Sequence, residues 1–262
     1  MLEVVDARRA FNAGTVDERP ALDGLSLTLA RGDFAVVIGS NGSGKTTLLN
    51  AIAGAVRLDA GTVRIDGVDV TRVTMERRAS VIARVFQDPM VGTASAMTVE
   101  ENLVLAELRG SRPTFRQALT PARRADYRAR LAAFSLGLEM RLGAKVSQLS
   151  GGQRQALALL MASLVAPKLL LLDEHTAALD PRTAAIVLDA TVRLISESGL
   201  TALMVTHNMR HAIDFGSRLV MMERGRIKLE LPAEVKGRMS IEDLVARFEI
   251  ADDKILLAGH AA

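Results

Sequence analysis

Three glycines, a lysine and a threonine fall between residues 39 and 46 in the pattern G-x-x-x-x-G-K-[ST]. Closely spaced glycines let consecutive backbone N–H groups turn toward an anion, and a helix that follows adds the positive end of its dipole. The lysine of such a loop supplies a charge for the β- and γ-phosphates of a nucleotide, and the hydroxyl supplies an oxygen for Mg²⁺. The segment therefore predicts a nucleotide-binding loop made of Gly39, Ser40, Asn41, Gly42, Ser43, Gly44, Lys45, Thr46 and Thr47.

The sequence on both sides of this loop supports the interpretation, because the motif requires a strand before it and a helix after it. Residues 34–38 form an apolar run, and residues 47–52 are typical of a helix. An ordinary glycine turn is the alternative, but it requires neither the complete spacing nor both flanking elements.

An acidic pair, Asp173 and Glu174, follows four consecutive leucines at 169–172. A short continuous apolar run is typical of a central parallel strand covered on both faces, and open α/β sheets bind ligands at the carboxyl ends of such strands. We expect Asp173 to hold Mg²⁺ and Glu174 to polarise the attacking water, a role worth about 10²–10⁴-fold in rate. A surface acidic pair that ends a strand is the alternative.

Four weaker signals gain meaning only as an ordered set with these two motifs. Gln87 ends a predicted strand, Leu-Ser-Gly-Gly-Gln occupies 149–153, Ala-Leu-Asp occupies 178–180, and His207 follows the apolar segment 202–205. Alone, the glycine pair fits a flexible turn, and a single histidine after a strand is more often structural than catalytic. Their significance comes from their order along the chain, which matches the pattern of a known family of ATPases.

Taken together, the motifs resemble those of the ATP-binding cassette (ABC) ATPases. The resemblance implies that Gln87 contacts Mg²⁺ or the water, that Asp180 lies in a D-loop at the subunit contact, and that His207 senses the γ-phosphate. It also implies that a second subunit's ATP is covered by Ser150, Gly151, Gly152 and Gln153. His175 stands where most cassettes carry proline, and we interpret it as a family variant.

An aromatic residue near the N-terminus, Phe11, stands where cassettes place a ring that stacks on adenine. Tyrosine is commoner there, but stacking works with any aromatic face and contributes about 1–3 kcal/mol per base in single-strand binders. A core phenylalanine on a strand is the alternative.

The resemblance covers roughly residues 3–248. Within the family, the chain is similar to one bacterial subfamily, the ATP-binding subunits of tryptophan/tyrosine-type amino-acid importers. It is carried by the segments 33–54, 84–93, 171–181 and 204–210. The family implies a motor that hydrolyses ATP with Mg²⁺, acts as an ATP-sandwiched homodimer on a separate membrane permease, and reaches a solute-binding protein only through that permease. It also implies that the permease docks on residues 88–110. A non-transport regulatory or assembly ATPase, or an exporter subunit, remains the alternative because the motor motifs are the same.

Composition agrees with such a subunit. The chain of 262 residues has no cysteine and a net charge of +3, so disulfides are excluded and nucleic acid is not indicated. Charged residues interrupt the apolar N-terminus, which predicts no signal peptide and a cytoplasmic location. The family resemblance implies that the subunit is peripheral on the inner face of the cell membrane. An arginine-rich segment at 109–130 is interpreted as a solvated helix face, with contact to anionic lipid as the alternative.

The elements that must position these residues alternate between strand and helix after the phosphate loop, which predicts an α/β fold with a mostly parallel sheet. Strands are expected near 3–10, 24–30, 33–38, 62–66, 81–86, 168–172, 201–205, 218–223 and 226–230, and helices near 45–53, 98–107, 121–136, 152–165, 181–198 and 208–214. With the family resemblance, this order predicts a RecA-like P-loop NTPase core with a small antiparallel β subdomain and an inserted α-helical subdomain.

One ABC ATP-binding domain is expected over 1–248. Its catalytic core and β subdomain would occupy about 1–88 and 166–230, its helical subdomain about 89–165, and a C-terminal tail would occupy 231–262. The chain carries a single set of motifs. Because the family's site needs motifs from two subunits, one set predicts a homodimer joined by ATP.

Overall fold

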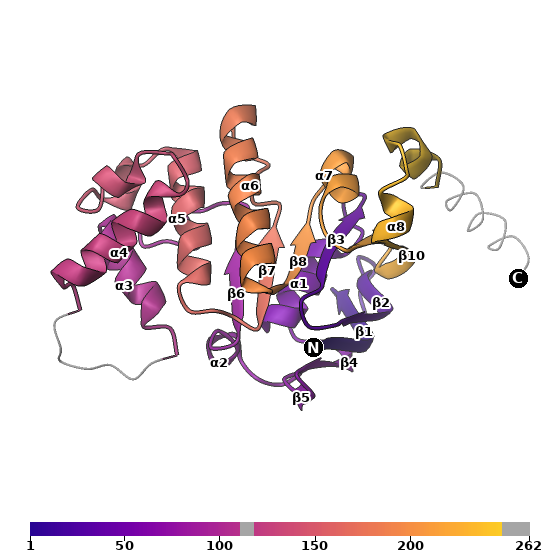
Figure 1. Ribbon diagram of the computed structural model, residues 1–262. Helices are drawn as coiled ribbons and strands as arrows, with labels where there is room; N and C mark the ends of the chain where they lie inside the picture. Colours follow the sequence, from indigo (N-terminus) through magenta and orange to yellow (C-terminus); the bar gives the residue numbers. More distant parts are fainter. Residues whose placement is uncertain (111–117, 248–262) are drawn as a thin grey trace, which may run out of the picture.

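A computed structural model of the chain describes residues 1–110 and 118–247, and Figure 1 shows its arrangement. The larger sheet has the order β10-β9-β3-β8-β7-β6, in which only the β9–β10 pair is antiparallel. Its strands are β3 (Phe34–Gly39), β6 (Ile82–Val85), β7 (Leu169–Asp173), β8 (Thr201–Val205), β9 (Arg218–Glu223) and β10 (Arg226–Pro232). The α/β class and the mostly parallel sheet are confirmed.

A smaller antiparallel sheet lies beside it, with the order β2-β1-β4-β5. Its strands are β1 (Leu2–Phe11), β2 (Arg19–Leu29), β4 (Ala60–Ile65) and β5 (Val68–Asp69). β2 begins earlier than expected because its polar first residue, Arg19, pairs with Phe11 at the end of β1.

The helices are α1 (Lys45–Ala53), α2 (Met75–Arg78), α3 (Val99–Glu107), α4 (Pro121–Ala132), α5 (Gly151–Ser163), α6 (Pro181–Ser198), α7 (Met209–Asp214) and α8 (Ala233–Lys236), with 3₁₀ turns at Leu138–Met140 and Val146–Gln148. Residues 241–247 are also helical. All the expected strands and helices are present. The prediction from sequence missed only short elements, such as α2 and β5. It also placed the end of α4 at residue 136, whereas the helix ends at Ala132. The expected subdomain limits stay predictions, and residues 248–262 of the tail lie outside the described part.

The two faces of the larger sheet pack into different cores, because successive side chains of a strand point to opposite sides. On β3, Ala35 and Val37 join a core made with α1 and the smaller sheet, whereas Val36 and Ile38 join a core made with α3 to α7. α1 and α5 therefore lie on opposite faces of the sheet. α3, α4 and α5 gather at one end of the molecule, and the smaller sheet lies at the other (Figure 1).

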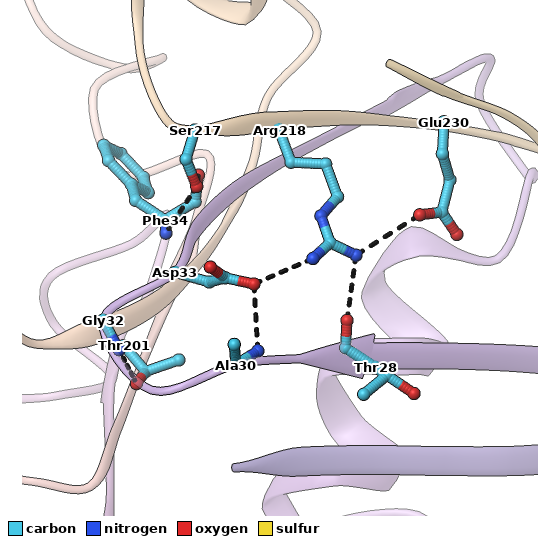
Figure 2. A network of polar contacts seen from close by, with 9 residues as sticks. All are labelled: Thr28, Ala30, Gly32, Asp33, Phe34, Thr201, Ser217, Arg218 and Glu230. Atoms are coloured by element: carbon cyan, nitrogen blue, oxygen red, sulfur yellow. Dashed lines mark hydrogen bonds and ion pairs between the residues drawn. The ribbon is translucent and has the colours of Figure 1, made fainter. Parts of the chain in front are cut away.

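A polar network joins the start of β3 to the smaller sheet and to β10 (Figure 2). Arg218 donates hydrogen bonds to the Asp33 carboxylate (2.8 Å), the Thr28 carbonyl (2.9 Å) and Glu230 (3.3 Å). Asp33 also accepts from the backbone N–H of Ala30 at 2.9 Å. The network fixes the entry to β3, the strand that leads into the glycine-rich loop.

The far end of α1 is held by a buried arginine on α2. The Arg78 guanidinium donates to the carbonyls of Ala51 (2.8 Å), Ile52 (2.7 Å), Val73 (2.9 Å) and Thr71 (3.0 Å). The first two are carbonyls of the last turn of α1; that of Ala51 also accepts from the backbone N–H of Gly54 at 3.2 Å, whereas that of Ile52 has no partner inside the helix. Desolvation by burial lowers the pKa of Arg78.

We expect Arg78→Ala to lower the free energy of unfolding by about 2–4 kcal/mol, because four buried or partly buried carbonyls lose the guanidinium donor at once. Chemical denaturation measures the change. The matched control is Arg77→Ala, which removes an exposed arginine from the same turn and should leave stability nearly unchanged. Equal effects of the two substitutions would contradict the capping role.

Candidate nucleotide-binding site

The glycine-rich loop connects β3 to α1, as the sequence predicts, and leaves no room for side chains at two of its glycines. A Cβ atom on Gly39 would lie 2.3 Å from the Met222 carbonyl oxygen, and one on Gly44 would lie 2.2 Å from the Ala21 carbonyl oxygen. Gly44 also has a φ of 100°, in the left-handed region that other residues rarely adopt. The loop backbone is therefore packed against β9 and β2 in a way that only glycine allows.

Gly44→Ala should weaken ATP binding by at least about tenfold and cost about 1–3 kcal/mol of stability from its backbone conformation alone. Isothermal titration with ATP and thermal unfolding measure the two effects. Gly143→Ala is the matched control, since a Cβ there meets no heavy atom within 4 Å and the φ of Gly143 is not positive. A Gly44 variant that binds ATP normally would show that the loop tolerates a different shape.

The loop contains two buried polar groups suited to an anion. Lys45 Nζ donates to the carbonyls of Gly39 (2.8 Å) and Ser40 (2.9 Å). Ser43 Oγ is buried and has no hydrogen-bond partner among the described residues. Desolvation lowers the pKa of Lys45, although Glu174 and Asp173 act in the opposite direction. A buried hydroxyl without a partner and a buried lysine in the same loop fit a phosphate group.

The acidic pair lies at the carboxyl end of β7, as expected from its sequence. Asp173 is buried, and its Oδ2 lies 2.6 Å from Arg84 Nη2. Glu174 has a φ of 43°, and its backbone N–H donates to the Val205 carbonyl. Its Oε2 lies 3.0 Å from His207 Nδ1. The structure therefore brings together Glu174, which directly follows β7, and His207, which lies just beyond β8, although the two are far apart in the sequence.

The oxygen atoms of this site fit a hard cation such as Mg²⁺, which prefers oxygen ligands and is usually held by one or two carboxylates plus phosphates. Candidate donors are Thr46 on α1, Asp173 on β7 and Gln87, which follows β6. Within the described ranges, no cluster of three or more His, Cys, Asp or Glu side chains could hold a metal. A Mg²⁺ ion held here would take its remaining ligands from phosphate oxygens and water.

His175, the neighbour of Glu174, points away from this chemistry. Its side chain is buried, and Nε2 lies 3.0 Å from the Thr191 hydroxyl on α6. That hydroxyl donates to the Val187 carbonyl at 2.8 Å, so the histidine must be the donor to it. Burial, and secondarily the charge of His211, lowers the pKa of His175 to about 4. The residue is a neutral packing group at neutral pH, in agreement with its interpretation as a variant.

The glycine-pair segment begins α5 and has a capping role that the motif did not reveal. Ser150 caps the helix by accepting from the Gln153 N–H, and Gln153 Oε1 accepts from the Ser150 N–H in return. A Cβ on Gly152 would lie 2.0 Å from Thr183 Cγ2, so the glycine lets α6 pack closely. Among the described residues, no hydrogen bond or ion pair joins residues 150–153 to the loop at 39–46.

Two further candidates lie at exposed ends of elements. Asp180 caps α6 by accepting from the Thr183 N–H at 3.1 Å, and hydrogen bonding from the Thr183 side chain, then from its backbone N–H, lowers the pKa of Asp180. Phe11 ends β1 and is 39% exposed, so it is not a core residue, and the Arg9 guanidinium lies 5.1 Å from its ring centroid. One face of the ring is thus covered by a cation.

Most described arginines of the 109–130 segment have partners inside the molecule. Arg109 donates to the Val165 carbonyl, and ion pairs join Arg123 to Glu107, Arg124 to Glu100 and Arg130 to Asp126. Arg112 and Arg116 lie outside the described residues. These pairings favour a structural role for the segment over lipid contact.

The sheet order and the strand–loop–helix geometry define a P-loop nucleotide-binding ATPase of the cassette type. Residues 22–177 match the family described as "ABC transporter". The chain belongs to this family, and it is an ATPase.

Known relatives extend over nearly the whole chain. A "Tyrosine transport ATP-binding protein" of Clostridioides difficile is 39% identical over 96% of this chain and all of its own length. An "Aliphatic sulfonates import ATP-binding protein SsuB 2" of Agrobacterium fabrum is 36% identical, over 92% of this chain and 84% of its own length.

Solved cassettes have the same fold. The ATP-binding cassette MJ0796, bound as a dimer to ADP and Pi, has a TM-score of 0.76 at 28% identity and covers 89% of this chain and 99% of its own. The ADP conformation of MJ1267, a cassette of an ABC transporter, has a TM-score of 0.76 at 26% identity, covering 95% and 98%. In residues 1–110 and 118–247, no helix is long and apolar enough to cross a membrane.

Proposed function

We propose that this chain is the ATP-hydrolysing subunit of an importer for an amino acid or a similar small solute. The observation that carries the proposal is the full-length similarity to a protein named as a tyrosine transport ATP-binding protein. The relatives named as sulfonate and methionine import proteins support a role in import, but they differ in solute and so do not favour any one of them. The subunit would act on a separate permease at the inner face of the membrane.

The residues of the site divide the chemistry between binding and hydrolysis. The loop N–H groups and Lys45 hold the β- and γ-phosphates, and Thr46 and Asp173 supply oxygens for Mg²⁺. The metal, when bound, neutralises charge on the phosphates. Glu174 accepts a proton from the attacking water, and His207, 3.0 Å from it, orients that carboxylate and senses the γ-phosphate. Phe11 stacks on the base through its open face.

A second copy of the chain would complete the site. Lys45 begins α1 and Ser150 caps α5, and these helices pack on opposite faces of the sheet. A nucleotide held by the loop of one copy is therefore covered by residues 150–153 of the other, with Asp180 at the contact. The dimeric MJ0796 cassette supports this arrangement by analogy.

The permease would dock at a cleft of about 490 Å³ that α3 and α5 share with the segment after β6. Its lining includes Val91 and Leu105, which are 65% and 50% exposed, together with Met161. Exposed apolar groups that surround a cleft are typical of a protein interaction site.

Co-purification from membranes of the native host tests the proposal. The tagged subunit is extracted in mild detergent, and its partners are identified by mass spectrometry. A polytopic membrane protein in comparable amount is the expected result. Recovery of soluble proteins alone would leave the ATPase intact and favour a regulatory or assembly role instead.

A further inference from the structure

Arg84 on β6 links the metal-binding carboxylate to two other elements. Its side chain is 12% exposed, with Nη2 2.6 Å from Asp173 Oδ2 and Nη1 2.6 Å from Asn50 Oδ1 on α1. The guanidinium carbon lies 4.6 Å from the centroid of the Phe86 ring. Because the arginine fork is planar and rigid, the three contacts fix its position together.

The chain of contacts continues from Phe86 to α5. The Phe86 carbonyl accepts a hydrogen bond of 3.1 Å from Gln155 Nε2, and Gln155 is fully buried. Its Oε1 has no hydrogen-bond partner in the described part of the chain. Arg84 and Phe86 also line the 490 Å³ cleft. One arginine thus lies between Asp173, the segment that carries Gln87, and the helix that Ser150 caps.

We propose that Arg84 is a positioning residue that acts as the internal counter-cation of Asp173 and competes with Mg²⁺ for its carboxylate. This inference rests on the proposed nucleotide site. A guanidinium at 2.6 Å occupies one carboxylate oxygen, and its charge opposes a second cation in a poorly solvated place. Because Mg²⁺ is usually held by one or two carboxylates, the charge of Arg84 would reduce the affinity of Asp173 for it.

The consequence is that retention of Mg²⁺ depends on the position of the cleft and of α5. A displacement of Phe86 or Gln155 changes the contact between the Phe86 ring and the Arg84 guanidinium. Arg84 then loses support and withdraws from Asp173. Occupation of the cleft by a partner that displaces Phe86 therefore favours retention of the metal.

The test compares the dissociation constant of ADP in EDTA with that in excess Mg²⁺, using the full chain and no hydrolysis. The ratio of the two constants measures how much the metal tightens nucleotide binding. For Arg84→Gln we expect this ratio to rise by about tenfold, since the competing charge is removed. Arg84→Lys keeps the charge but loses the fork, and its ratio should lie between those of wild type and Arg84→Gln.

Two further variants separate this role from a merely structural one. Arg31→Gln removes an arginine from an exposed ion pair with Asp66 and should leave the ratio unchanged. Gln155→Leu should raise the ratio by about twofold to threefold, because Phe86 loses a buried hydrogen bond and the guanidinium its support. A structural defect alone changes both dissociation constants together and leaves their ratio constant.

An unchanged or lower ratio in Arg84→Gln overturns the role of Arg84, and an unchanged or lower ratio in Gln155→Leu overturns the link to α5. Both results leave the proposed function standing, provided that wild type binds ADP. A wild-type chain that binds no ADP overturns the nucleotide site and this inference together.

Discussion

Glu174→Gln should bind MgATP almost as tightly as wild type and lose about 10²–10⁴-fold of its turnover, because a positioned general base contributes that much. The amide has the shape of the carboxylate and can keep the 3.0 Å contact with His207. It cannot accept the proton of the attacking water at neutral pH. Steady-state phosphate release and ATP titration measure the two quantities separately.

The same variant also tests the dimer. Because hydrolysis no longer separates the subunits, size-exclusion chromatography with MgATP should show a species of twice the monomer mass that is absent with ADP. Asp126→Asn is a suitable control, since it removes an exposed carboxylate paired with Arg130 on α4. Near-normal hydrolysis by Glu174→Gln would show that another group orients the water.

The parts of the fold that follow from local patterns could be predicted closely. The leucines at 169–172 are buried on both faces of the larger sheet, as a continuous apolar run requires. The glycine-rich loop lies between the expected strand and helix because its glycines are needed where the backbone approaches Met222 and Ala21. Such features depend on a few neighbouring residues, so they can be predicted directly from the sequence.

Long-range polar contacts could not be predicted in the same way. Arg78 lies 27 residues from Ala51, and Arg84 lies 89 residues from Asp173. From sequence alone, an arginine is predicted to lie on the surface unless its partners are known. The capping role of Ser150 was also hidden, although the Ser-x-x-Gln spacing is a local signal that could have revealed it.

Lys45→Ala should weaken ATP binding by roughly tenfold to a hundredfold. This loss corresponds to the free energy of one or two hydrogen bonds to a charged group. In the free protein the ammonium donates to the Gly39 and Ser40 carbonyls, which hold it over the place where phosphate is expected. Removal of the side chain takes away both the charge and the support of the loop. Titration with ATP in the absence of hydrolysis measures the loss.

The pH dependence of this affinity separates the charge of Lys45 from its packing. Burial lowers the pKa of Lys45, so the free protein loses this cation at a lower pH than an ordinary lysine does. Wild-type affinity for ATP should therefore fall as the pH rises through that lowered pKa, and Lys45→Ala should lack this fall. Lys168→Ala is the control, because its ammonium is half-exposed and paired with Asp66. Equal pH profiles of wild type and Lys45→Ala would mean that the loop binds phosphate through its backbone alone.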